Sequence, residues 1–75
     1  MKAVVYSMPT CSFCVDAKNL LEKNNIEYEE VILGETISVN DFMVKFPNVT
    51  SVPVITLGEK NIFGYSQLLE ELYSE

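Results

Sequence analysis

The 75-residue chain contains no histidine, no tryptophan and no arginine, and only two cysteines. A structural zinc site normally needs four nitrogen or sulfur ligands, so one chain of this composition is not expected to bind zinc. Its five basic residues are all lysines and are outnumbered by eleven acidic residues, which gives a net charge of −6. Because nucleic-acid binding depends on clustered basic side chains, nucleic acid is not an expected partner.

Long apolar runs are also missing. Every run is far shorter than the roughly 20 apolar residues of a transmembrane helix, so we expect no membrane association. The chain begins Met1-Lys2-Ala3 without the charged, apolar and cleavage-site regions of a secretory signal. We therefore predict a soluble protein of the reducing cytoplasm. A chain of this length has room for one core, so residues 1–75 are predicted to form a single domain.

The two cysteines lie close together in the segment Cys11-Ser12-Phe13-Cys14. If a helix begins near Thr10 or Cys11, its free N–H groups and its dipole favour a thiolate at the first sulfur, and the thiolate is the reactive form. The three-residue spacing places both thiols on one helix face, within reach of a disulfide. The pattern favours dithiol–disulfide exchange. Half of a zinc site, a static disulfide and two buried apolar residues are the alternatives.

Hydrophobic periodicity predicts the first three elements. The apolar run from residue 3 to residue 6 indicates a buried parallel strand over residues 2–7, and branched and aromatic residues indicate a second strand over residues 26–33. Between them lies a helix that ends at Asn24-Asn25. Its apolar stripe consists of Cys14, Ala17, Leu20 and Leu21. A strand–helix–strand unit of this kind predicts a parallel pair of strands, with the cysteines at the carboxyl end of the first strand.

The second half of the chain predicts a helix, a hairpin and a helix. A second helix is expected with Ser38 or Thr36 as its cap and Pro47 as its stop, and Gly58-Glu59-Lys60 is expected to turn a hairpin. The apolar stripe of the second helix repeats at helical spacing in Val39, Phe42, Met43 and Phe46. The last helix has its stripe in Tyr65, Leu68, Leu69 and Leu72. The predicted fold is an α/β sandwich with a small mixed sheet, and the phenylalanines and leucines of these stripes are expected in the core.

Residues 6–14, together with Ala17-Lys18, Ser51-Val52-Pro53 and Gly64, resemble the glutaredoxin family. The resemblance covers essentially the whole chain. It implies a thioredoxin-like fold with a four-stranded mixed sheet flanked by three helices. It also implies a glutathione-dependent thiol–disulfide oxidoreductase of the small dithiol type, in which Cys11 is the nucleophile and Cys14 resolves the mixed disulfide. Its substrates would be protein disulfides and glutathione mixed disulfides, in electron transport and cell redox homeostasis, with ribonucleotide reductase among its acceptors and the protein acting as a monomer.

The resemblance also assigns binding residues. The positions that match the family's glutathione and substrate site are Thr10, Phe13, Val52, Pro53, Gly64, Tyr65 and Ser66. The resemblance implies a cis peptide bond before Pro53 that faces the cysteines. It also implies that the last helix begins at Gly64-Tyr65-Ser66, where free N–H groups suit a glutathione carboxylate. Glutathione is the expected reductant, and no metal ligand is predicted.

Three departures from the family pattern keep two further functions open. Met8 stands where many glutaredoxins place a lysine that pairs with a glutathione carboxylate, and Phe13 lacks the hydroxyl of the usual tyrosine. Ser12 replaces the usual proline, and some glutaredoxins with serine at this position bridge an iron–sulfur cluster as dimers. The other alternative is a small redoxin that thioredoxin reductase reduces, although the aromatic-glycine and Arg-Pro signature of that class is missing here.

Overall fold

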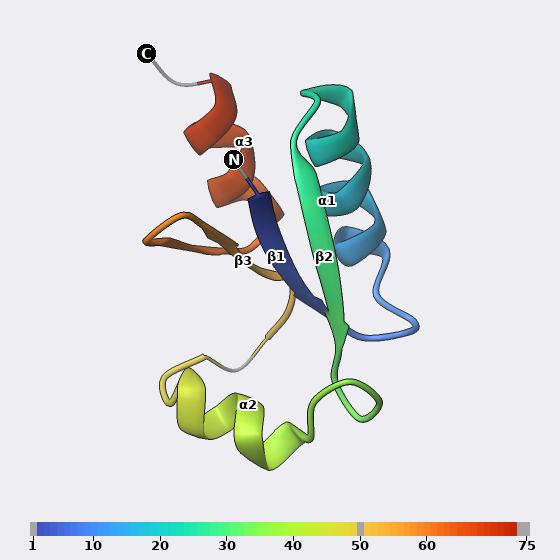
Figure 1. Cartoon of the computed structure of the whole chain (residues 1–75), viewed down its shortest axis with the longest axis vertical. Helices are drawn as coiled ribbons and strands as arrows, with labels where there is room; N and C mark the ends of the chain where they lie inside the picture. The colour runs from blue at the N-terminus through green and yellow to red at the C-terminus, as the bar shows by residue number, and fades with distance from the viewer. Residues whose placement is uncertain (1, 50, 74–75) are drawn as a thin grey trace.

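The computed structural model describes residues 2–49 and 51–73. Figure 1 shows the arrangement of its helices and strands. In chain order the elements are β1 (Lys2–Ser7), α1 (Ser12–Lys23), β2 (Glu27–Ile32), α2 (Val39–Lys45), β3 (Val54–Leu57), β4 (Lys60–Phe63) and α3 (Tyr65–Tyr73). The predicted order of elements is confirmed, and their ends agree with the predicted ends to within a few residues.

The strands form one mixed sheet in the order β2-β1-β3-β4. β1 is parallel to β2 and antiparallel to β3, and β3 and β4 form an antiparallel hairpin. The central position of β1 explains its apolar sequence, because both faces of a central strand are covered. Val5 is fully buried and Tyr6 is nearly so. The thioredoxin-like architecture implied by the resemblance is therefore present, and the two cysteines follow the carboxyl end of β1.

Two hydrophobic clusters cover the two faces of the sheet. The first joins the sheet to α1 and α3 and consists of Ala3, Val5, Ala17, Leu20, Leu21, Ile55, Ile62 and Leu68. The second joins the sheet to the segment around α2 and consists of Tyr6, Phe42, Phe46 and Val54. Tyr6 lies 5.6 Å from Phe42 and 5.2 Å from Phe46 between ring centroids. α1 and α3 contact each other, and Figure 1 shows α2 apart from both, near the carboxyl end of β1.

The helix ends follow the predicted signals. At the end of α1, the Asn24 side chain donates to the Leu20 carbonyl at 2.8 Å, and Asn25 has a positive φ of 59°. At the start of α2, the Ser38 hydroxyl accepts the backbone N–H of Asp41 at 3.0 Å, so Ser38 is the cap and Thr36 is not. α1 therefore ends, and α2 begins, where a side chain satisfies an otherwise free backbone group.

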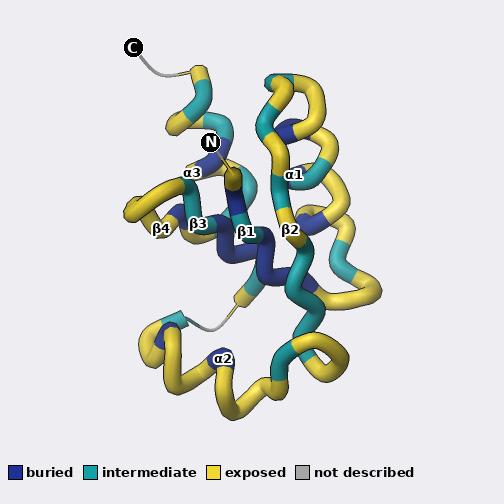
Figure 2. Tube along the Cα trace, in the orientation of Figure 1, coloured by how far each residue is buried: buried dark blue, intermediate teal, exposed yellow. Residues whose placement is uncertain are grey.

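The predicted apolar stripe of α2 is only partly buried. Phe42 and Phe46 are in the core, but Val39 is 50% exposed and Met43 is 53% exposed. Figure 2 shows most of α2 as exposed, in contrast to the buried centre of the sheet. Val39 and Met43 are exposed because only one side of α2 packs against the end of the small sheet.

Candidate functional site

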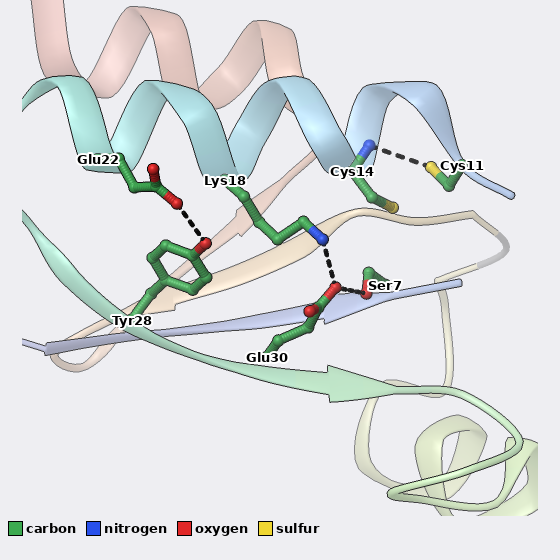
Figure 3. Close-up of polar contacts among 7 residues, drawn as sticks. All are labelled: Ser7, Cys11, Cys14, Lys18, Glu22, Tyr28 and Glu30. Carbon is green, nitrogen blue, oxygen red and sulfur yellow. Dashed lines mark hydrogen bonds and ion pairs between the residues drawn. The ribbon is translucent and has the colours of Figure 1, made fainter. Parts of the chain in front are cut away.

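Cys11 occupies the N-cap position of α1. Its Sγ accepts the backbone N–H of Cys14, with an N–Sγ distance of 3.2 Å (Figure 3). An oxygen of serine, threonine or aspartate usually makes this contact at a helix start. The first turn of α1, which is fully described, contains no acidic residue. The N–H groups and the dipole of α1 thus stabilise negative charge on a partly exposed sulfur, which is the arrangement that a nucleophilic cysteine needs.

Cys14 has the opposite environment. Its side chain is 1% exposed, whereas Cys11 is partly exposed, and both cysteines are free thiols. Burial, and after it a hydrogen bond with Cys11, raise the pKa of Cys14 to about 12, while the charge of Lys18 acts in the other direction. Cys14 therefore keeps its proton at neutral pH. The two thiols are neighbours but differ in accessibility, and the buried one is held protonated, as a resolving thiol should be.

The loop before β3 lies against the reactive sulfur. The peptide bond between Val52 and Pro53 is cis, as the resemblance implied. Cys11 Sγ is 3.9 Å from the Val52 carbonyl oxygen, so this loop faces the cysteines. The N–H of Gly64 donates to the Pro53 carbonyl at 3.0 Å, which ties the same loop to the start of α3. Gly64 has a φ of +102°, a conformation that suits glycine.

The structure brings six of the seven predicted binding residues together. They line a depression of about 230 Å³, here called the α3 depression, whose lining consists of Phe13, Val52, Pro53, Phe63, Gly64, Tyr65 and Ser66. The rings of Phe13 and Tyr65 lie 6.4 Å apart between centroids. Thr10 is exposed in the turn before α1 and is not among the lining residues. Phe63 was missed as a site residue because the sequence pattern shows it only as the end of a hairpin strand.

A second, more apolar hollow lies beyond Val52. This α2 groove has a volume of about 350 Å³ and is lined by Met8, Leu33, Val39, Phe42, Met43, Val49, Ser51 and Val52. Val52 lines both hollows and stands between them. In the sequence, Met8 stands out only as the replacement of a lysine, and helical spacing places Val39 and Met43 in an apolar stripe. Helical spacing predicts which residues share the apolar side of a helix, but not whether another element packs against them. The groove was therefore not predicted.

A polar network lies beside the buried thiol. Glu30 Oε2 accepts the Lys18 ammonium at 2.6 Å and the Ser7 hydroxyl at 2.8 Å (Figure 3). These two contacts lower the pKa of Glu30. Because Ser7 is on β1, Lys18 on α1 and Glu30 on β2, the network joins three elements just behind the cysteines. The sequence placed Lys18 on the polar face of its helix but could not identify its partner on a different element.

Neither a metal-binding group nor a membrane-spanning helix is found among the described residues. Among residues 2–49 and 51–73, no group of three or more histidine, cysteine, aspartate or glutamate side chains is placed to hold a metal ion. Within the same residues, none of the helices has the length and apolar character needed to cross a membrane.

Comparison with known proteins gives consistent matches. Residues 3–62 match the family model described as glutaredoxin. Glutaredoxin-1 of vaccinia virus is 35% identical over 75 residues, covering 92% of this chain and 69% of the viral protein. The hybrid peroxiredoxin hyPrx5 of Haemophilus influenzae is 33% identical over 64 residues, covering 85% of this chain but 26% of the length of that relative. The crystal structure of glutaredoxin 1 from Francisella tularensis superposes with a TM-score of 0.81 at 26% identity, covering 95% of this chain and 91% of that chain.

Proposed function

The chain belongs to the glutaredoxin family, and from that membership we propose that it is a glutathione-dependent thiol–disulfide oxidoreductase. Its substrates are protein disulfides and glutathione mixed disulfides. The observation that carries the proposal is the pairing of an accessible N-cap sulfur at Cys11 with a buried, protonated thiol at Cys14. A dithiol built only for stability would not need this difference in exposure between its two members.

The geometry supports a two-step exchange. The Cys11 thiolate attacks one sulfur of a substrate disulfide, which forms a mixed disulfide and releases the other substrate sulfur as a thiolate. Cys14 then loses its proton and attacks Cys11 Sγ, which forms the Cys11–Cys14 disulfide and releases the second substrate thiolate. Both released thiolates take up protons. Two glutathione thiols restore the dithiol and leave as glutathione disulfide.

The α3 depression is the proposed glutathione site. Glutathione is a short peptide with two carboxylates, and the first N–H groups of α3 at Tyr65 and Ser66 suit one of them. The rings of Phe13 and Tyr65 supply apolar contacts. The backbone of Val52, beside the reactive sulfur, is placed to pair with an extended ligand as an added strand.

Met8 supports a second candidate reductant. Where many relatives have a lysine, this chain has a half-exposed thioether on an apolar groove, and the whole chain carries a net charge of −6. Both features weaken the attraction of an anionic ligand such as glutathione. Thioredoxin reductase is therefore the alternative source of electrons for the same dithiol.

The test is glutathione-coupled reduction of a small glutathione mixed disulfide under anaerobic conditions. We expect turnover by the wild type and by Cys14→Ser, because a monothiol route needs only Cys11, and no turnover by Cys11→Ser. Activity retained in Cys11→Ser would contradict the assignment of the nucleophile. An inactive wild type whose disulfide is reduced by thioredoxin reductase would establish the alternative reductant. Visible absorbance in protein purified anaerobically would point to a bridged iron–sulfur cluster instead.

The cellular setting is part of the same proposal. We place the reaction in the reducing cytoplasm and in a monomeric protein. Its partners are disulfide-bearing proteins, with ribonucleotide reductase as one candidate acceptor. Co-purification with Cys14→Ser, in which Cys11 cannot be resolved by its neighbour, would capture such partners as mixed disulfides that a reductant releases.

A further inference from the structure

The α2 groove is an apolar surface beside the reactive sulfur. Met8, Val39 and Met43 line it and are 47%, 50% and 53% exposed. Its described lining contains no charged side chain, and Ser51 is its one polar member. Exposed apolar side chains that gather in one hollow usually mark a binding surface. Methionine suits such a surface because its flexible thioether adapts to ligands of different shape.

The groove is continuous with the site of disulfide exchange. Val52 lines the groove, and its carbonyl oxygen is 3.9 Å from Cys11 Sγ. Met8, which also lines the groove, lies in the turn just before Cys11, and its carbonyl accepts the Cys11 N–H at 3.3 Å. A polypeptide whose cysteine is bonded to Cys11 therefore has one flank of its chain over Val52 and next to the groove.

The groove differs from the α3 depression in the ligand that it suits. Glutathione carries charged groups at both ends, and the described lining of the groove offers them no charged partner. Its volume of about 350 Å³ lies at the lower end of the range for ligand pockets, about 300 to 1,000 Å³. It has room for one or two apolar side chains rather than for a whole helix.

We propose that the α2 groove binds an apolar side chain that flanks the reactive cysteine of a disulfide-bearing polypeptide. The groove thereby selects protein disulfides with a large aliphatic or aromatic residue beside the cysteine. This inference rests on the proposed exchange reaction at Cys11. It adds a preference among substrates that the reaction itself does not require.

The experiment compares cyclic peptides that are closed by one disulfide and differ only in the residues flanking the cysteines. One carries leucine at these positions and the other carries serine. Fully reduced protein is mixed with each peptide anaerobically, without glutathione, and the rate constant for peptide reduction is measured. Each value is normalised to the rate with oxidised 2-mercaptoethanol, which has no flanking residues. We expect the wild type to reduce the leucine peptide about five to ten times faster than the serine peptide, the low end of what one apolar contact contributes to selectivity.

Two variants of α2 test whether the α2 groove causes the preference for the leucine peptide. In Val39→Asn/Met43→Gln the ratio of the two rates should fall to below about two, because two apolar walls of the groove become polar. Val44→Asn is the matched control, since Val44 is on the same helix and 81% exposed but does not line the groove. It should retain the wild-type ratio. Thermal unfolding of both variants checks that the fold is kept.

The outcomes separate this inference from the proposed function. Equal rates on the two peptides in the wild type would overturn the groove as a selective site while leaving disulfide exchange intact. A preference that survives in Val39→Asn/Met43→Gln would place the selectivity elsewhere. If the reduced protein reacts with none of the disulfides, the exchange reaction fails and the inference fails with it.

Discussion

The raised pKa of the buried Cys14 thiol can be tested by making it the only thiol of the chain. Cys11→Ser leaves Cys14 as the sole cysteine of the chain. Burial is the largest cause of the rise in the pKa of Cys14 from 9.0 to about 12, and the substitution leaves that burial in place. Because alkylating reagents react with the thiolate, the rate of modification at a fixed pH follows the thiolate fraction.

The structure sets the size of the effect. At pH 8, a pKa of about 12 lowers the thiolate fraction of Cys14 about a thousandfold below that of a cysteine with a pKa near 9. Replacing Cys11 removes a hydrogen bond that contributes to the rise. We therefore expect folded Cys11→Ser to react with iodoacetamide at least about a hundredfold more slowly than an accessible cysteine, and burial of the sulfur slows the reaction further.

The assay follows alkylation by mass spectrometry from pH 7 to pH 10. In this range the rate with Cys11→Ser should keep rising with pH, because the thiol does not finish titrating. The same variant unfolded in guanidinium should react at the rate of an ordinary cysteine, and folded Cys14→Ser should react quickly through Cys11. A rate for folded Cys11→Ser within about tenfold of the unfolded rate would refute the assignment of Cys14 as a buried, protonated thiol.

Two further predictions concern the residues that support the site. Lys18 and Ser7 lower the pKa of Glu30 below its ordinary 4.5, so their contacts stabilise the fold above that pH and are lost as the pH falls. Urea unfolding should show Glu30→Gln less stable by up to about 1 kcal/mol at pH 7 and closer to the wild type at pH 3, whereas an equal difference at both pH values would contradict this. Gly64→Ala should cost about 1 to 2 kcal/mol through its positive φ, although an added Cβ would meet no described atom within 4 Å. An unchanged urea midpoint would show that the backbone relaxes there.

Local patterns in the sequence were sufficient to predict the elements and the reactive pair. The position of Cys11 at a helix start follows from the apolar strand before it and the apolar stripe after it. The end of α1 at Asn24 and the cap of α2 at Ser38 follow from side chains that satisfy nearby backbone groups. These features depend on residues a few positions apart, so the sequence alone contains the necessary information.

The remaining features depend on residues that are distant in the chain. The placement of Val52 against Cys11 came from the family resemblance, because spacing alone does not bring residues 41 positions apart together. The contact of Glu30 with Lys18 joins a strand to a helix. The exposure of Val39 and Met43 depends on how far the small sheet extends under α2. A stripe of apolar residues predicts which side of a helix turns inward but not where the covering surface stops.

The packing of the two sheet faces by separate clusters has a consequence for how this protein can change over time. The first cluster holds α1 and α3, which carry the reactive sulfur and the proposed glutathione site. The second holds the segment around α2, whose exposed Val39 and Met43 line part of the groove. Substitutions on the exposed side of α2 leave the packing beneath Cys11 as it is. Partner choice and electron-transfer chemistry can therefore diverge independently within a single chain of this size.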